Sequence, residues 1–163
     1  MTGRSQAPEA ASDVEFTLDQ RLCLALYTAS RAMTARYRVA LGQLGLTYPQ
    51  YLVMVLLWEE GTCSVGGIGH RLSLDSSTLS PLLKRLQAMD LVTRTRATND
   101  ERLMLVGLTE RGAQLHEDAA QVTVDICEAT GITVAQQLEL VATLRELTVQ
   151  LDASTTRAAA KYH

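Results

Sequence analysis

Apolar residues recur at helical spacing in three stretches of the chain that open alike, with a threonine followed three residues later by a glutamine. These pairs are Thr17 and Gln20, Thr47 and Gln50, and Thr133 and Gln136. Such a pair can satisfy the free N–H groups at the start of a helix. The pattern therefore predicts helices over residues 18–42, from 48 to about 60, and over 134–151.

The predicted terminal helices each carry an apolar stripe, and the helix between residues 48 and 60 is apolar on nearly all sides, as core helices are. The stripe of the first helix, which we expect to be buried, consists of Leu22, Leu26, Ala29 and Met33. The stripe of the last helix consists of Leu140, Leu144, Leu147 and Leu151. Thr109 caps a further long helix that ends at Gly131. Because one domain has no use for so many terminal stripes, we expect the first helix and the last two to form a dimer interface.

The middle of the chain changes from helical spacing to alternation. A short helix is predicted over residues 65–72 despite its glycines, and Asp75 caps another that ends near Met89. Residues 91–96 and 102–108 then alternate in the way of two strands joined by a short turn. Two such helices followed by a hairpin are typical of the winged helix-turn-helix arrangement. The predicted fold class is mainly α with a small β-hairpin wing, combining a winged helix-turn-helix domain with a helical dimerisation region.

The predicted organisation is a single winged-helix domain over residues 17–152, with a flexible tail at 1–16 and a second tail at 153–163. Within the domain, residues 46–108 form the DNA-binding lobe, and residues 17–45 and 109–152 form the dimerisation helices. No apolar run reaches the ~18 residues that a membrane span needs, and the first twelve residues lack the apolar region of a signal peptide. We therefore expect a cytoplasmic protein without a membrane partner.

The net charge of −3 is unevenly distributed. Residues 20–57 contain four arginines and no acid, whereas residues 110–152 contain eight acids and two arginines. One face is therefore suited to an anionic partner, although the overall charge alone would not predict DNA binding.

The helix that follows Asp75 has the composition of a recognition helix. Its first turns carry small hydroxyl residues that let a helix enter the ~12 Å major groove and reach base edges, and the basic residues after them can reach phosphates. These positions are Ser76, Ser77, Thr78, Ser80, Lys84 and Arg85. Pro81 argues against an ordinary surface helix, since a proline beyond the first turn removes a backbone hydrogen bond.

The predicted hairpin carries the second set of DNA-binding candidates. Arg94 and Arg96 lie on its first strand, and Arg102 lies at its tip, where a guanidinium can enter a narrow minor groove. Asp100, two residues earlier, can hold that guanidinium in place. The plainer interpretation is a solvated turn with a surface ion pair.

Three cysteines without a C-x-x-C spacing make a poor disulfide scaffold and a poor zinc site. Cys23 lies near the start of a helix, where the helix dipole and nearby arginines favour thiolate over thiol. Tyr27 lies one turn further along the same face, and Tyr37 lies ~21 Å along the helix and can approach Cys23 only from another chain. The plain alternative is that each cysteine is a small buried apolar residue. The three histidines are scattered, so neither a metal site nor a cofactor is expected.

The residues from Asp90 to Gly112, including Asp100 and Arg102, resemble the MarR family of regulators. The runs at residues 22–33 and 46–54 resemble its OhrR branch, the repressors of organic-hydroperoxide resistance. The resemblance implies that Tyr37 and Tyr48 hydrogen-bond the reactive sulfur of Cys23. It also implies that Cys127 is the resolving cysteine of the two-cysteine subclass, which bonds the partner chain, while Cys63 has no such match.

The sequence departs from the family at two places. Gly66, Gly67 and Gly69 stand where better helix formers are usual, and Ser77 stands where many relatives have glycine.

We therefore expect a repressor, not an enzyme, that binds an inverted-repeat operator as a reduced homodimer and is released when an organic hydroperoxide oxidises Cys23. Two alternatives remain. One is a MarR-type repressor released by a small phenolic or lipophilic ligand, with Cys23 as a packing residue. The other is a thiol peroxidase that uses Cys23 and Cys127 in turnover.

Overall fold

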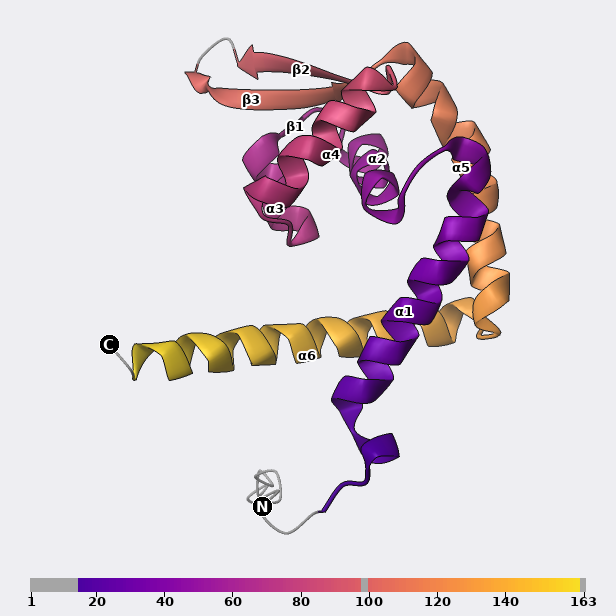
Figure 1. Cartoon of the computed structure of the whole chain (residues 1–163), viewed down its shortest axis with the longest axis vertical. Helices are drawn as coiled ribbons and strands as arrows, with labels where there is room; N and C mark the ends of the chain where they lie inside the picture. Colours follow the sequence, from indigo (N-terminus) through magenta and orange to yellow (C-terminus); the bar gives the residue numbers. More distant parts are fainter. Residues whose placement is uncertain (1–14, 98–99, 162–163) are drawn as a thin grey trace, which may run out of the picture. The chain divides into compact units, whose positions relative to one another are not determined.

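The computed structural model describes residues 15–97 and 100–161, without the side chains of Asp100 and Glu101 (Figure 1). The chain divides into two units, one up to Ala35 and one from Arg36 onward. Each unit is described by itself.

The first unit contains a capped turn and most of helix α1 (Leu22–Ala40). The expected capping box is present at Thr17, whose backbone N–H donates to Gln20 Oε1 over 3.0 Å. It caps only a 3-10 turn, η2 (Leu18–Gln20), because Arg21 is extended at φ −80° and ψ 120°. The predicted helix over 18–42 is therefore wrong at both ends, and α1 gives way to a second 3-10 turn, η3 (Leu41–Leu44).

The apolar stripe of α1 is not buried in the single chain, contrary to expectation. No residue of α1 is buried, and Leu22 is 56% exposed. Helical spacing identifies the apolar side of a helix but does not say which surface covers it.

The second unit has its core in α2 (Tyr48–Glu60), α3 (Val65–Leu72) and α4 (Ser76–Ala88). As predicted, α2 begins at the Thr47 capping box, and most of its buried positions are apolar. Its fully buried members Val53, Met54 and Leu57 belong to the same core as Ile68 of α3 and Leu83 of α4. The predicted helix over residues 65–72 is confirmed to the residue.

The sheet contains one strand more than the sequence predicted. Strands β2 (Val92–Ala97) and β3 (Asp100–Leu108) form the expected antiparallel hairpin, and β1 (Cys63–Ser64) pairs with the other edge of β3, in the order β1-β3-β2 (Figure 1). A strand of two residues is too short to show alternation, so no sequence pattern could reveal it. The fold class, mainly α with a small β-hairpin wing, is confirmed.

The last two helices are α5 (Glu110–Thr130) and α6 (Val134–Ala160), separated by Gly131 in the left-handed region at φ 67°. The predicted C-terminal tail at 153–163 is wrong for residues 153–160, which continue α6. Alanine is the strongest helix former, and Ala153 and the run from Ala158 to Ala160 extend the helix past Leu151. No residue of α6 is buried in the single chain.

Gly112 joins the start of α5 to the start of the hairpin. Its backbone passes so close to Leu91 that a Cβ would overlap the Leu91 carbonyl group. Thr109 N donates to that same carbonyl over 3.1 Å, and Trp58 Nε1 donates to Gly112 O over 2.9 Å. The site therefore requires glycine.

Candidate DNA-binding surface and thiol site

The start of α4 is held by Asp75, which accepts hydrogen bonds from Ser77 Oγ (2.6 Å) and from Thr78 N (2.7 Å). These two bonds hold the pKa of the Asp75 carboxyl below its usual range, and the bond from Ser77 makes the larger contribution. The predicted N-cap is thus present. The hydroxyl of Ser77, a candidate for base contact, is engaged in the cap in the free protein.

The two sides of α4 differ sharply. Leu79, Leu82, Leu83 and Leu86 are buried, and they fix the helix to the core. Most of the predicted contact residues are exposed on the other side: Ser76, Ser77, Thr78, Pro81, Lys84 and Arg85. Ser80 is half-buried. Pro81 lies inside the helix and cannot donate to the carbonyl of Ser77.

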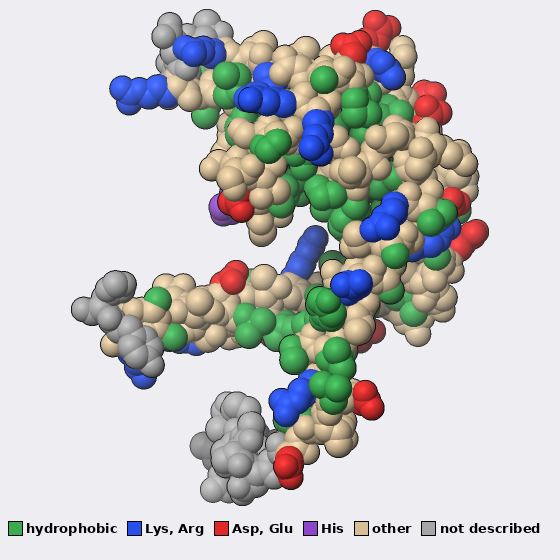
Figure 2. All heavy atoms as spheres, in the orientation of Figure 1, with side chains coloured by type: hydrophobic (Ala, Val, Ile, Leu, Met, Phe, Trp, Pro, Cys, Tyr) green, Lys and Arg blue, Asp and Glu red, His purple; other side chains and the backbone are tan. Residues whose placement is uncertain are grey.

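The arginines of the hairpin are not equivalent. Arg96 and Arg102 are exposed, whereas Arg94 is half-buried on the strand face that also carries buried Val92. Arg94 Nε is buried and has no hydrogen-bond partner among the described residues. The Asp100 side chain, expected to hold Arg102, lies outside the described residues. Figure 2 shows basic side chains gathered over α4 and the hairpin.

Three tyrosines of the second unit form a cluster at the end of α1 and the start of α2. The ring of Tyr37 lies 4.5 Å from that of Tyr48 and 5.8 Å from that of Tyr51, centroid to centroid. Burial raises the pKa of Tyr37 to about 12, with smaller contributions from Tyr48, Tyr51 and Cys127. Burial, followed by the proximity of Tyr51, also raises the pKa of Tyr48. Both phenols therefore keep their protons near neutral pH and can donate hydrogen bonds.

Cys127 is near enough to Tyr37 to contribute, as the smallest of the causes, to the raised pKa of that phenol. It is half-buried in the last turns of α5. Its Sγ donates to Gln137 Oε1 of α6 over 3.6 Å, and its backbone carbonyl accepts from Thr130 Oγ1 over 2.7 Å. The structure thus brings together Tyr37, Tyr48 and Cys127, three of the five predicted thiol-site residues.

The other two residues, Cys23 and Tyr27, belong to the first unit. Cys23 is exposed in the first turn of α1, a turn without acidic residues. The Tyr27 hydroxyl accepts a hydrogen bond from Arg31 Nη1 over 3.0 Å. The meeting of Cys23 with the second unit's tyrosines stays a prediction.

Several residues with a part in the site were missed from the sequence. Tyr51 is 6% exposed, and its hydroxyl oxygen lies 3.4 Å from Thr123 Oγ1. The sequence places Gln137 in a helix but gives no sign of its contact with Cys127. The spacing of Tyr51, three residues after Tyr48, was the one feature of the sequence that could have indicated its place in the cluster. Thr123 and Gln137 lie too far along the chain from the tyrosines to be inferred.

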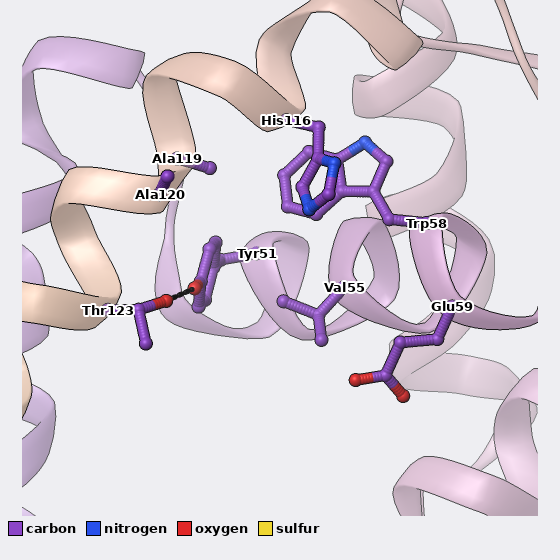
Figure 3. A pocket seen from close by; sticks show the side chains of 8 residues that line it. All are labelled: Tyr51, Val55, Trp58, Glu59, His116, Ala119, Ala120 and Thr123. Atoms are coloured by element: carbon purple, nitrogen blue, oxygen red, sulfur yellow. Dashed lines mark hydrogen bonds between the residues drawn. The ribbon is translucent and has the colours of Figure 1, made fainter.

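A pocket of about 210 Å³ lies between α2 and α5 (Figure 3). Trp58 and His116 stack on one side of it with ring centroids 5.0 Å apart, Tyr51 and Thr123 meet on the other, and Glu59 lies near Val55. The remaining lining residues are Ala119 and Ala120. The lining thus contains a carboxylate and neither lysine nor arginine.

Cys63, expected to be a bystander, lies in β1, and burial raises the pKa of its thiol. Among the described residues, no three histidine, cysteine, aspartate or glutamate side chains are placed to hold a metal ion.

A helical lobe that ends in a hairpin wing, with a polar helix face on a buried leucine base, defines a winged helix-turn-helix protein. Residues 36–119 match the family described as transcriptional regulator SarA/Rot. The organic hydroperoxide resistance transcriptional regulator of Bacillus subtilis strain 168 is 49% identical over 105 residues, covering 64% of this chain and 71% of that protein.

Two solved structures of AbfR from Staphylococcus epidermidis are also similar. Reduced AbfR bound to DNA has a TM-score of 0.68 and 34% identity, covering 82% of this chain and 93% of that one. Disulfide-formed AbfR has a TM-score of 0.58 and 37% identity, covering 80% and 92%. The chain belongs to the MarR-like winged-helix transcriptional regulators, in the branch of the organic hydroperoxide resistance regulators.

Proposed function

We propose that this chain is a redox-sensing transcriptional repressor that binds operator DNA as a reduced homodimer and leaves it when an organic hydroperoxide oxidises Cys23. The carrying observation is the cluster of Tyr37 and Tyr48, whose ring centroids lie 4.5 Å apart, near Cys127 and on the same unit as the polar face of α4. Support also comes from the kinship with a hydroperoxide resistance regulator and with AbfR, solved bound to DNA and as a disulfide.

In the DNA-bound state, α4 enters the major groove. The exposed hydroxyls of Ser76 and Thr78 face base edges, and Lys84 and Arg85 reach phosphates. Arg96 and Arg102 of the hairpin lie on the neighbouring backbone or in the minor groove. Arg94 is half-buried and its Nε is shielded from solvent, so it is less accessible to a phosphate than Arg96 and Arg102 are. Two such lobes on one dimer match an inverted repeat.

Dimerisation is supported by the apolar side chains that single chains leave uncovered on α1 and α6 (Figure 2). Leu22, Leu138 and Val149 are each more than half exposed. A helix that buries none of its apolar residues needs a partner surface, and a second copy supplies the same residues. In that dimer, Cys23 of one protomer meets Tyr37, Tyr48 and Cys127 of its partner.

The proposed chemistry has two balanced steps. The Cys23 thiolate attacks the terminal oxygen of the hydroperoxide and the O–O bond breaks, so Cys23 becomes a sulfenic acid and the hydroperoxide is reduced. The alkoxide takes up from solvent the proton that the thiol had released and leaves as the alcohol. The Cys127 thiol of the partner then attacks that sulfur, an S–S bond forms, and the hydroxyl group leaves as water. Because half-site spacing is a rigid requirement, a small shift of the interface helices releases the DNA.

The location follows from this function. No single described helix is long and apolar enough to cross a membrane, although the bent pair Leu22–Leu44 and Tyr48–Glu60 passes the same test by length and composition. A thiol switch that acts on chromosomal DNA requires the reducing cytoplasm, and we assign the protein there as part of the proposal.

The test is fluorescence anisotropy of the full chain on DNA from its own upstream region. Cumene hydroperoxide should release the wild-type protein, and dithiothreitol should restore binding. Cys23→Ser should bind and ignore peroxide, whereas Cys127→Ser should be released without forming an intersubunit disulfide. A wild-type protein that binds but ignores peroxide would leave the DNA-binding half standing and remove the switch.

The pocket in Figure 3 bears on the small-molecule alternative. A phenolic acid would bring a second carboxylate into a lining that already contains Glu59 and has neither lysine nor arginine to balance it. A neutral lipophilic ligand fits the pocket better. Peroxide-independent release of DNA by such a ligand would favour that alternative, and repeated peroxide turnover with dithiothreitol would favour the peroxidase.

A further inference from the structure

We infer that Gln137 is a positioning residue that latches the resolving thiol: its side-chain oxygen holds Cys127 in the reduced protein and must release it before the disulfide forms. This inference rests on the proposed role of Cys127 and assigns to α6 a part in the timing of the switch.

The latch spans the turn between α5 and α6. Cys127 lies in the last turns of α5, Gln137 lies in the first turns of α6, and Cys127 Sγ donates to Gln137 Oε1 over 3.6 Å. Such a distance is within hydrogen-bond range for the large sulfur atom, and the S–H group is a weak donor. Both side chains are half-buried, so water competes only partly for the contact.

Both ends of the latch are anchored by other bonds. Thr130 Oγ1 donates to the Cys127 carbonyl over 2.7 Å, and this bond holds the end of α5. On the other side, Thr133 N donates to Gln136 Oε1 over 2.8 Å, and Gln137 N donates to the Thr133 carbonyl over 2.9 Å. The backbone that carries Gln137 is therefore fixed by the capping box, and the side chain is presented to the sulfur.

The chemistry of the second step makes this contact consequential. Attack on the partner's sulfenic acid uses a lone pair of the Cys127 sulfur, and the thiol proton departs with the hydroxyl group as water. While the Cys127 thiol donates a hydrogen bond to Gln137 Oε1, the sulfur is held against α6 and is not placed to attack the partner. Disulfide formation must break this contact, which also removes the side-chain bond that joins α5 to α6 across Gly131.

The first test measures Cys127 alone, in a full-length chain carrying Cys23→Ser and Cys63→Ser. Gln137→Met keeps the length and helix preference of the side chain but removes the acceptor, whereas Gln137→Glu keeps an acceptor. The rate of alkylation by iodoacetamide should rise about twofold to fivefold in Gln137→Met, the size expected for losing one weak hydrogen bond.

The matched control is Gln121→Met. Gln121 lies on α5, where its Nε2 donates to Asp125 Oδ1 over 2.8 Å, and within the described part of the chain it makes no hydrogen bond to the Cys127 thiol. We expect Gln121→Met and Gln137→Glu to react no faster than the parent chain. Equal rates in Gln137→Met and the parent, or equal acceleration by Met and Glu, would overturn the latch.

The second test uses the chain with all its cysteines and one equivalent of cumene hydroperoxide. Trapping with dimedone follows the Cys23 sulfenic acid, and mass spectrometry follows the Cys23–Cys127 disulfide. In Gln137→Met, the sulfenic acid should convert about twofold to fivefold faster while its formation rate stays unchanged. Conversion at the wild-type rate would overturn the latch alone. Absence of the disulfide in the wild-type protein would overturn the proposed resolving step and the latch with it.

Discussion

The lobe from α2 to β3 and the helices α1 and α6 differ in how they cover their apolar side chains. Each has an apolar face, but the lobe buries Leu57, Ile68 and Leu83 completely within one chain, whereas α1 and α6 bury no residue at all. The lobe is therefore a folded unit of the protomer, and the proposed dimer assigns the exposed helices to its interface. A repressor needs both properties, because the DNA-reading surface must be rigid and the spacing between two such surfaces must be adjustable.

The largest loss of stability is expected at the junction between α5 and the hairpin. Gly112→Ala places a Cβ onto the Leu91 carbonyl and displaces the Trp58 hydrogen bond, so we expect a loss of about 3 kcal/mol or more in the free energy of unfolding. Urea unfolding, followed by circular dichroism, measures it. A loss below about 1 kcal/mol would mean that α5 and the hairpin are free to separate.

A charged residue introduced on the exposed side of α6 should weaken dimer formation without unfolding the protomer. Leu138 is 65% exposed in the single chain, so Leu138→Glu should leave the protomer folded but shift the dimer toward monomer and abolish operator binding at nanomolar concentrations. Sedimentation velocity and circular dichroism together give the two results. Glu139→Gln, on the neighbouring exposed position, is the control that should leave the dimer intact. An undisturbed Leu138→Glu dimer would place the interface elsewhere.

The proposed contact of Lys84 with a phosphate predicts a smaller loss of affinity that is the same for every DNA sequence. Lys84→Ala should weaken binding to operator and to unrelated DNA alike, by about 1 kcal/mol, and should lower the salt slope of log K by about 1. Titrations at several salt concentrations measure this. A loss confined to the operator would instead assign Lys84 to base recognition, and Lys161→Ala, far along α6, should change nothing.

Two glycines of α3 differ in the space around them. A Cβ on Gly66 meets nothing within 4 Å, whereas one on Gly69 would lie 2.9 Å from Leu74 O. Gly66→Ala should therefore raise the free energy of unfolding by about 0.5–1 kcal/mol through helix propensity, and Gly69→Ala should lower it. The same sign for both variants in urea unfolding would contradict the packing described for α3.

The tyrosine cluster predicts a dependence of stability on alkaline pH. Burial raises the pKa of Tyr37 from 10.0 to about 12, so between these values the unfolded chain loses this proton while the folded chain keeps it. Stability is complete below pH 10 and declines as the pH rises toward 12. Tyr37→Phe should make the decline shallower, whereas Tyr27→Phe should not, and urea unfolding across this pH range distinguishes them.

Much of the architecture could be predicted because it rests on local rules. The Thr47 and Thr133 capping boxes, the Asp75 cap and the bounds of α3 follow from residues within one or two turns of each other. The same rules failed where the outcome depended on a single backbone angle: the Thr17 box caps only a turn because Arg21 is extended. The apolar stripe of the last helix ends at Leu151, but α6 continues to Ala160, because alanine favours a helix without needing an apolar face.

In the candidate site, too, local features could be predicted from the sequence, whereas contacts between distant segments could not. Local patterns were enough to identify the residues that can do the chemistry: hydroxyl and basic side chains on α4, a thiol at a helix start, and tyrosines at helical spacing. Other features became visible only in the folded chain: Tyr51 joins Tyr37 and Tyr48, Cys127 lies near Tyr37, Gln137 accepts a hydrogen bond from its thiol, and Arg94 is half-buried. These contacts join segments tens of residues apart, or cross the left-handed turn at Gly131, and their geometry is set by close packing in the folded chain, which no local pattern records.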